Sequence, residues 1–190
     1  MLNRMSLDGY FATTNKTTWG MDWFVHDPKV DEYAHKMGDN PAVDTLILGG
    51  ITYRGFEKAW KPFLNNPDAP EFMRKTAEEL TQLKKIVFSK TLQQDDITWD
   101  NTEVHAENPA EVIKKIKQEK GGSLLIMGSG QIIQQLANEG LIDEYDFIMS
   151  PVVSGGGKFL FKDVKQFKLN FLGAKSFDSG NVILRYEAVK

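Results

Sequence analysis

Residues 124–136 read LLIMGSGQIIQQL, in which an apolar run meets Gly128, Ser129 and Gly130 before a helical pattern begins. Glycines at such a turn allow unusual backbone angles and the close approach of a ligand. The helix that follows would present free N–H groups to a phosphate, and Ser129 could cap it. The stretch is therefore compatible with a phosphate cradle or with an ordinary tight turn. The dinucleotide fingerprint G-x-G-x-x-G is matched only in part, because Ile133 stands at its third glycine.

The amino-acid composition excludes several other kinds of chemistry. The 190 residues contain no cysteine, so disulfides, a thiol nucleophile and cysteine-ligated zinc are excluded. The histidines, His26, His35 and His105, do not have the spacing of metal ligands, and we expect no metal site. A net charge of −3 gives no general attraction to nucleic acid or to an anionic membrane. Neither a signal peptide nor a run of transmembrane length is evident, so we expect a cytoplasmic protein.

The elements around the glycine turn alternate between apolar runs and helical patterns. Three short runs have the composition of buried strands: DTLILGG (44–50), KKIVFS (84–89) and SLLIMG (123–128). A helix opened by Pro70 separates the first two, and four of its side chains recur at helical spacing: Phe72, Thr76, Leu80 and Leu83. A second helix follows Asn108, which can cap it. This alternation is typical of a largely parallel sheet with helices on both faces.

After residue 140 the pattern changes to that of extended chain. LIDEYDFIMSPVV (141–153) predicts a strand, SGGGKFLF (154–161) predicts a loop, and FLGAKSFDSGNVILRYEAV (171–189) predicts a hairpin that turns at residues 178–181. We therefore expect a single α/β domain over residues 1–190. Its central sheet is mostly parallel, flanked by helices, and carries an antiparallel C-terminal hairpin.

Five separated segments occur in the order of a known family. They are MSLDGYFA (5–12), LILGGITYRGF (46–56), KKIVFSKTL (84–92), LLIMGSGQIIQQL (124–136) and LIDEYDFIMSPVVSGGGKFLF (141–161). The chain resembles the dihydrofolate reductase-like superfamily, and most closely the reductase domain of bacterial riboflavin biosynthesis as a stand-alone member. The resemblance implies an oxidoreductase that transfers hydride from NADPH to a small pterin- or pyrimidine-like substrate, similar to 5-amino-6-(5-phosphoribosylamino)uracil reductase. It also implies a homodimer.

The resemblance favours the phosphate cradle at the glycine turn. In this family the matching segment holds the cofactor pyrophosphate against a helix N-terminus, and the residues that carry over are Gly128, Ser129, Gly130 and Gln131.

Two further segments imply contacts with the cofactor phosphates. Gly49 and Thr52 match a family pattern that opens a second helix at the phosphates, whereas Gly50 stands where the family commonly has arginine. Ser89 and Lys90 match a strand end that contacts the adenosine 2′-phosphate, which a hydroxyl and a cation would suit. A plain turn at the glycines and a solvated lysine are the alternatives.

The first segment is the family's loop beside the nicotinamide and the substrate. By this resemblance Asp8 orients the substrate or its own loop, and Phe11 and Ala12 line the nicotinamide pocket. Trp23 is expected to stack on a heteroaromatic substrate, with Trp19 as a weaker candidate, although both could be packing residues.

The proton donor is less well defined. Classical dihydrofolate reductases carry a carboxylate on the helix near the substrate, and here Asp27 and Asp31 are candidate catalytic residues, although a carboxylate at a helix start can simply cap it. Two other functions therefore stay open: a true dihydrofolate reductase, and a nucleotide-binding protein without catalysis.

Overall fold

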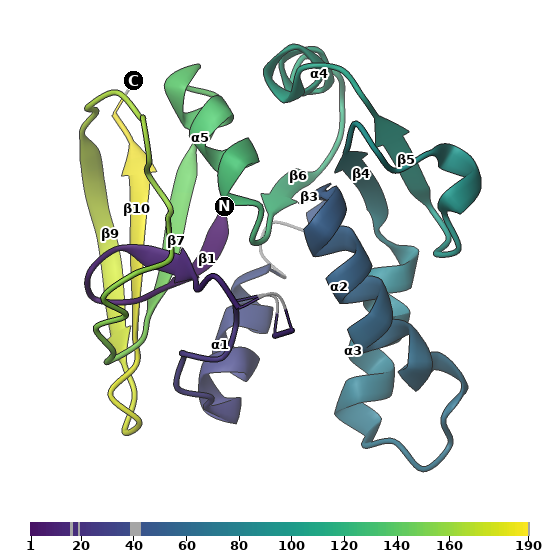
Figure 1. Ribbon diagram of the computed structural model, residues 1–190, viewed down its shortest axis with the longest axis horizontal. Helices are drawn as coiled ribbons and strands as arrows, with labels where there is room; N and C mark the ends of the chain where they lie inside the picture. Colours follow the sequence, from purple (N-terminus) through teal and green to yellow (C-terminus); the bar gives the residue numbers. More distant parts are fainter. Residues whose placement is uncertain (16, 19, 39–42, 190) are drawn as a thin grey trace.

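Two four-stranded sheets lie edge to edge in the described part of the chain, residues 1–15, 17–18, 20–38 and 43–189 of the computed structural model (Figure 1). The first sheet has the order β1 (Leu2–Met5), β7 (Glu144–Met149), β10 (Val182–Ala188) and β9 (Leu169–Ser176). The second has the order β5 (Thr102–His105), β4 (Lys84–Phe88), β3 (Val43–Gly49) and β6 (Ser123–Ile126). A bridge between Leu2 and Met127 joins them.

The directions of the strands confirm the predicted architecture. All neighbours in the second sheet are parallel, as are β1 and β7. β10 runs antiparallel to both β7 and β9, which forms the expected C-terminal hairpin. The loop prediction for residues 154–161 is wrong at one point, because β8 (Lys158–Phe159) pairs with β2 (Tyr10–Ala12). This pairing places the 154–161 segment directly beside the first family segment.

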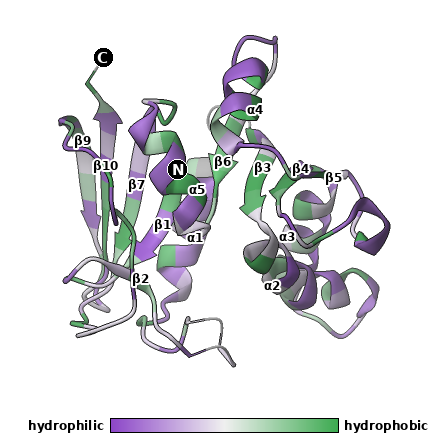
Figure 2. Cartoon of the chain, turned by 45° about the horizontal axis from the view of Figure 1, so that its top comes forward, coloured by the Kyte–Doolittle hydropathy of each residue, from purple (hydrophilic) through white to green (hydrophobic). Residues whose placement is uncertain are grey.

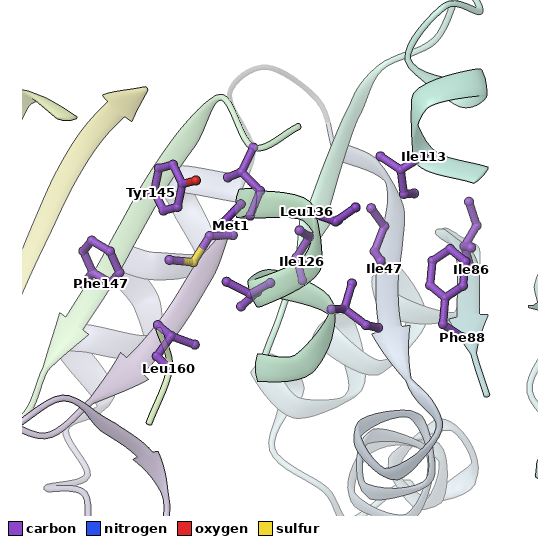
Figure 3. Close-up of a cluster of buried hydrophobic side chains, with 14 of the residues drawn as sticks. Met1, Ile47, Ile86, Phe88, Ile113, Ile126, Leu136, Tyr145, Phe147 and Leu160 are labelled. Atoms are coloured by element: carbon purple, nitrogen blue, oxygen red, sulfur yellow. The ribbon is translucent and has the colours of Figure 1, made fainter. Parts of the chain in front are cut away.

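Helices cover both faces of the sheets, because the strands are apolar on both sides. Along β3, Leu46 and Leu48 face α2 (Gly50–Trp60) and α3 (Glu71–Gln82), whereas Ile47 faces α4 (Pro109–Ile116) and α5 (Gly130–Asn138). α1 (Pro28–Gly38) covers the other sheet. The central strands are mostly hydrophobic in Figure 2, and Figure 3 shows side chains from both sheets meeting around α5. α5 therefore binds the two sheets into one core.

The starts of α3 and α4 follow the sequence signals, but one side chain of α3 that is expected to be buried is exposed. Asn108 accepts a hydrogen bond from the N–H of Ala110 at 2.9 Å and caps α4. Pro70 immediately precedes α3, and Thr76 is buried as the periodicity predicts. Phe72 does not follow that periodicity, since it is 48% exposed. Phe72 lies in the first turn of α3, and its ring is 6.1 Å from the ring of His35 in α1 between centroids. The ring therefore packs against α1 and not against the sheet.

Lys85 is a buried cation that the apolar pattern of β4 does not reveal. Its side chain is fully buried, and its ammonium group donates to the carbonyls of Leu80 and Leu83 at 2.7 Å and of Thr81 at 3.1 Å. These carbonyls belong to the C-terminal end of α3, where a cation is favourable. Burial lowers the pKa of Lys85 to about 8. The residue thus fixes α3 to the start of β4.

Candidate active site

The ends of β3 and β6 meet at the glycine turn through one shared hydroxyl. The N–H of Gly49 donates to Ser129 Oγ at 2.8 Å, and Ser129 Oγ donates to Thr52 Oγ1 at 3.1 Å. Ser129 occupies the N-cap position of α5 in a left-handed conformation, but its side chain makes no cap hydrogen bond. The expectation that this side chain caps α5 is therefore wrong, because the hydroxyl joins the two strand ends instead.

The first turns of α2 and α5 both begin at this junction. α2 starts directly after β3, and α5 starts after the short link 127–129 that follows β6. The N-cap residues Gly49 and Ser129 make no side-chain cap hydrogen bond, and in α5 the N–H of Ile132 donates to the carbonyl of Ser129 at 2.9 Å, so the free N–H groups are those that precede it. Unpaired N–H groups and the helix dipole favour an anion at such an end. Two of them side by side, with the Thr52 hydroxyl between, suit a diphosphate.

Small residues keep the junction compact. Gly128 has a φ of +61°, and a Cβ there would lie 3.2 Å from Thr52 Cγ2. A Cβ on Gly50 would lie only 2.8 Å from Ser89 Oγ, so a side chain at position 50 would have to displace the Ser89 side chain. Ser89 Oγ accepts from the N–H groups of Thr91 and Leu92 at 3.2 and 3.0 Å.

The remaining predicted cofactor residues lie around this junction. Lys90 is exposed just beyond the end of β4, and Gln131 is exposed in the first turn of α5. Gly130 is buried, and a Cβ on it would overlap the ring of Phe11. Ala12 is buried at the end of β2. The structure therefore brings Phe11 to α5, although the two are far apart in sequence.

Asp8 is held as an ionised hydrogen-bond acceptor. Its carboxylate accepts from Ser6 Oγ at 2.6 Å and from the N–H groups of Ser154 and Gly155 at 2.9 and 2.8 Å. These bonds, with Ser6 contributing most, lower its pKa to about 2. The carboxylate thus ties the first family loop to the glycine loop at residues 155–157, which accords with a role in orienting its own loop.

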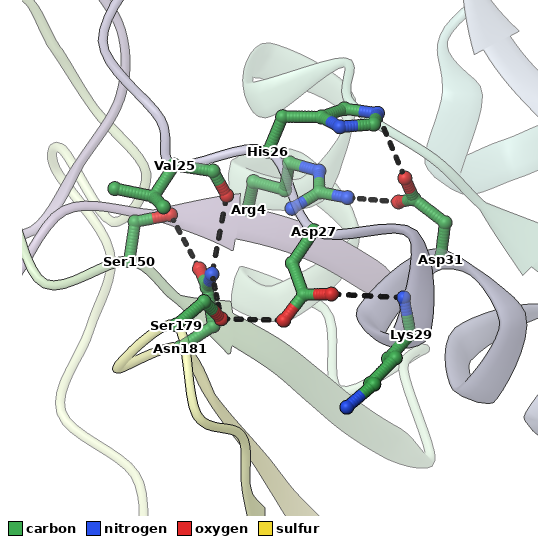
Figure 4. Close-up of polar contacts among 9 residues, drawn as sticks. All are labelled: Arg4, Val25, His26, Asp27, Lys29, Asp31, Ser150, Ser179 and Asn181. Carbon is green, nitrogen blue, oxygen red and sulfur yellow. Dashed lines mark hydrogen bonds and ion pairs between the residues drawn. The ribbon is translucent and has the colours of Figure 1, made fainter.

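The two helix carboxylates are engaged in structural contacts (Figure 4). Asp27 accepts from the N–H of Lys29 at 2.9 Å and from Ser179 Oγ at 2.6 Å, and the bond from Ser179 is the main cause of its lowered pKa. Asp31 pairs with Arg4, and His26 Nε2 lies 3.3 Å from its second oxygen. Asp27 therefore acts as a cap for α1 and a link to the hairpin, and Asp31 neutralises Arg4.

Asn181 is a buried residue of this region that the sequence identifies only as part of a turn. Its amide nitrogen donates to the carbonyl of Val25 at 3.1 Å and to Ser179 Oγ at 2.9 Å. Its amide oxygen accepts from Ser150 Oγ at 3.0 Å, and the side chain is fully buried (Figure 4). The hairpin thus holds the loop that leads into α1.

Trp23 lies in that loop and is half-buried. Its ring meets Phe24 edge-on at 6.2 Å between centroids, and Nε1 is buried with no hydrogen-bond partner among the described residues. Its expected contact with substrate stays a prediction. Trp19 lies outside the described residues.

A separate cavity of about 500 Å³ opens at the opposite edge of the sheets. Its lining includes the starts of several strands, at Val43, Lys84 and Ser123. Both acidic and basic side chains border it, and Asp143 and Glu144 form ion pairs there with Lys117 and Arg185. Ligands of open α/β sheets bind at the carboxyl ends of the strands, so the junction at Ser129 is the better candidate for a nucleotide.

The described residues show neither a metal centre nor a helix that could cross a membrane. Among the described residues, no group of three or more histidine, aspartate or glutamate side chains is arranged to hold a metal ion. None of the described helices combines the length and the apolar character that a membrane crossing requires.

The strand order, with two helix N-termini at the strand ends, is the dihydrofolate reductase-like fold expected of the family whose model matches this chain. The chain belongs to the RibD C-terminal domain family, whose model matches residues 1–183. The uncharacterized protein YyaP of Bacillus subtilis (strain 168) is 28% identical over 186 residues, which are 96% of this chain and 90% of the relative. A second Bacillus subtilis protein, YwjB, is 29% identical over 180 residues and covers 91% of this chain and 88% of its own length.

Solved structures share the fold over the whole chain. A pyrimidine reductase-like protein from Corynebacterium diphtheriae has a TM-score of 0.64 at 13% identity and covers 100% of this chain and 90% of its own. A deaminase and 5-amino-6-(5-phosphoribosylamino)uracil reductase from Thermotoga maritima has a TM-score of 0.63 at 14% identity; the match covers 99% of this chain and 55% of that one. The likeness therefore extends over about half of the Thermotoga protein.

Proposed function

We propose that this protein is an NADPH-dependent oxidoreductase that reduces a small pterin- or pyrimidine-like substrate. The observation that carries the proposal is the junction of Gly49, Thr52 and Ser129, where the uncapped first turns of α2 and α5 meet at the carboxyl ends of parallel strands. Family membership and the names of the Corynebacterium and Thermotoga proteins supply the reaction class.

The residues present fit a nicotinamide dinucleotide. Thr52 and the N–H groups of the two first turns would hold the diphosphate, and the Ser89 hydroxyl with Lys90 would hold the 2′-phosphate. Ser89 Oγ accepts from two backbone N–H groups, so its own hydrogen can be directed to a phosphate oxygen. When bound, the cofactor supplies the hydride, and the protein supplies position and a dry surface.

Asp8 has a positioning role in this proposal. Its pKa near 2 keeps the carboxylate ionised at neutral pH, with all three hydrogen bonds donated to it. A group in this state cannot give a proton to the substrate. We infer that it fixes the glycine loop against the loop that carries Phe11.

Titration with NADPH, followed by the change in nicotinamide fluorescence, tests the cofactor site. We expect saturable binding at one site per chain. The loss of NADPH absorbance is then measured with dihydrofolate and with a set of pyrimidine and pterin substrates. Turnover with a pyrimidine supports the proposal, and turnover with dihydrofolate supports the first alternative. Binding without turnover of any of them supports the non-catalytic alternative, and no binding contradicts the proposal.

A homodimer is part of the same proposal. Phe171 and Leu172 on the edge strand β9 are 62% and 46% exposed, and exposed apolar side chains grouped on one strand favour an interface. Size-exclusion chromatography with light scattering should give the mass of two chains, and the mass of one chain at micromolar concentration contradicts this part of the proposal.

A further inference from the structure

Three glycines from distant parts of the chain close around residues 11–13. Gly130 begins α5, Gly157 precedes β8, and Gly20 lies in the loop before α1. A Cβ on any of the three would collide with this short segment. Because a side chain at any of the three positions would have to displace part of the same short segment, the three glycines share one steric role.

The contact at Gly130 is made with an aromatic ring. A Cβ there would overlap two ring carbons of Phe11 and would lie 3.2 Å from a third. Gly130 has no positive φ, and a glycine in a helix is about 1 kcal/mol less favourable than alanine. Backbone geometry therefore does not require glycine here, whereas the ring does. The same ring fills the side of Gly130 that a Cβ would occupy, so that side does not face a phosphate.

The contacts at Gly157 and Gly20 are made with backbone. A Cβ on Gly157 would overlap the carbonyl oxygen of Ala12 and would lie 3.2 Å from Thr13 Cα. A Cβ on Gly20 would lie 2.8 Å from both the backbone nitrogen and the carbonyl oxygen of Thr13, and 2.7 Å from the side chain of Ala12. The N–H of Thr13 also donates to the carbonyl of Gly20 at 3.0 Å. Backbone cannot give way as a flexible side chain can, so these two contacts fix the path of the segment.

Hydrogen bonds connect the same segment to α5. Gln134 of α5 donates to the carbonyls of Phe159 and Leu160 at 3.1 and 3.0 Å, and β8 pairs with β2. The N–H of Leu160 donates to the carbonyl of Gly9 at 3.2 Å. The strand that carries Phe11 is thereby held to the helix whose N-terminus faces the cofactor phosphates.

We propose that Gly130 and Gly157 are positioning residues that set Phe11 and Ala12 as the wall against the nicotinamide half of the cofactor. This inference rests on the proposed function. Ser89 and Lys90, expected at the adenosine half, lie at the end of β4, on a different sheet from β2. A shift of β2 should therefore weaken binding of the whole cofactor and leave binding of its adenosine half unchanged.

The main test compares NADPH with adenosine 2′,5′-bisphosphate, which lacks the nicotinamide. In Gly130→Ala, the dissociation constant for NADPH should rise about tenfold, and that for the bisphosphate should stay within twofold. Phe11→Leu shortens the side chain that the new methyl group meets, so adding it to Gly130→Ala should restore NADPH affinity to within about threefold of Phe11→Leu alone. Gly156→Ala is the control, because a Cβ there meets nothing within 4 Å.

Gly157→Ala provides a second test of the inference, at a residue outside the proposed phosphate site. Gly157 has a φ of +135°, so any side chain there also strains the backbone. Gly155→Ala is the control for a side chain placed at positive φ in this loop, since Gly155 has a φ of +67° and open space around it. NADPH binding should weaken at least fivefold more in Gly157→Ala than in Gly155→Ala, with bisphosphate binding equal in the two. The melting temperature of each variant confirms that it is folded.

The outcomes separate the inference from the function on which it rests. Selective loss of NADPH binding, restored by Phe11→Leu, supports the inference. Equal loss of both ligands without restoration, or unchanged NADPH binding in folded Gly130→Ala, overturns it while the cofactor site stands. If Gly130→Ala does not fold, the Gly157 and Gly155 pair decides the question by the same criterion. A wild-type chain that binds neither ligand overturns the proposed function and this inference together.

Discussion

The two halves of the candidate site are built by different means. On the cofactor side, Gly49, Thr52 and Ser129 stand at or just after the ends of parallel strands and contact one another directly. On the substrate side, hydrogen bonds tie loops together across the chain: Ser179 to Asp27 over 152 residues and Asn181 to Val25 over 156 residues. The first half follows from the topology of the sheet, whereas the second depends on contacts between loops.

This difference predicts that the two halves can be damaged separately. A parallel sheet brings the carboxyl ends of neighbouring strands to one edge, so the phosphate site depends on the core beneath it. The loop that carries Trp23 depends instead on a few polar contacts with the hairpin. Substitutions in one half should therefore leave ligand binding in the other half intact.

The largest effect should come from Asn181. In Asn181→Ala the carbonyl of Val25 and the hydroxyl of Ser150 lose their buried partner, and the free energy of unfolding should fall by about 3 kcal/mol. Adenosine 2′,5′-bisphosphate should still bind within twofold of wild type. Urea denaturation measures the first quantity. Asn65→Ala, at an exposed position outside both sheets, is the control and should change stability by less than about 0.5 kcal/mol.

Loss of bisphosphate binding in a folded Asn181→Ala variant would show that the two halves are not separate. A loss of stability below about 1 kcal/mol would instead show that the polar network does not hold the loop.

The next effect concerns the choice between NADPH and NADH. Lys90 is the basic residue that stays at the expected 2′-phosphate position, since Gly50 replaces the family's arginine. A charge-assisted contact contributes about 1.5–3 kcal/mol, so Lys90→Ala should reduce the preference for NADPH about ten- to a hundredfold. NADH binding should not change. Lys84→Ala, an exposed lysine at the other end of β4, is the control. Equal binding of the two cofactors by wild type would make Lys90 an ordinary surface residue.

A smaller effect, common to both cofactors, is expected at Thr52. Its hydroxyl accepts from Ser129 at the point where the two helices begin. Thr52→Ala should weaken NADPH and NADH alike by about fivefold, close to the contribution of one neutral hydrogen bond. Thr52→Ser keeps the hydroxyl and should bind both cofactors as wild type does. A change for only one cofactor would place Thr52 away from the shared diphosphate.

The smallest effect is a dependence of stability on pH. The pKa of Asp8 is lowered from 3.8 to about 2, so its contribution to stability is complete above about pH 4 and is lost as the pH falls towards 2. Asp8→Asn removes this contribution, so the difference in unfolding free energy between wild type and variant should shrink as the pH is lowered from 5 to 3. A difference that stays constant over this range would mean that Asp8 is not held by the bonds from Ser154 and Gly155.

The sheet and the glycine turn could be predicted from the sequence because their signals are local. An apolar run followed by Gly128 predicts a strand end, and Asn108 before Pro109 predicts a helix start. The long apolar strands also predict burial on both faces, as β3 shows. These signals lie within a few residues of the feature they predict.

The roles of particular side chains could not be predicted, because their partners are distant. The hydroxyl of Ser129 bonds to Gly49, 80 residues away, instead of capping its own helix. Gly130 accommodates the ring of Phe11, which no spacing around Gly130 reveals. Phe72 has the spacing of a buried residue, but its ring is half exposed and contacts His35 of α1 instead of the sheet. The contacts of each of these three residues depend on how separate helices and strands pack together.

A crystal structure of the protein with NADP⁺ tests the central claim most directly. We expect the diphosphate between the first turns of α2 and α5, within hydrogen-bond distance of Thr52, and the nicotinamide beside Phe11. The 2′-phosphate should lie near Lys90. A cofactor bound in the cavity at the opposite edge of the sheets, or a diphosphate away from the junction of Gly49 and Ser129, would contradict the account.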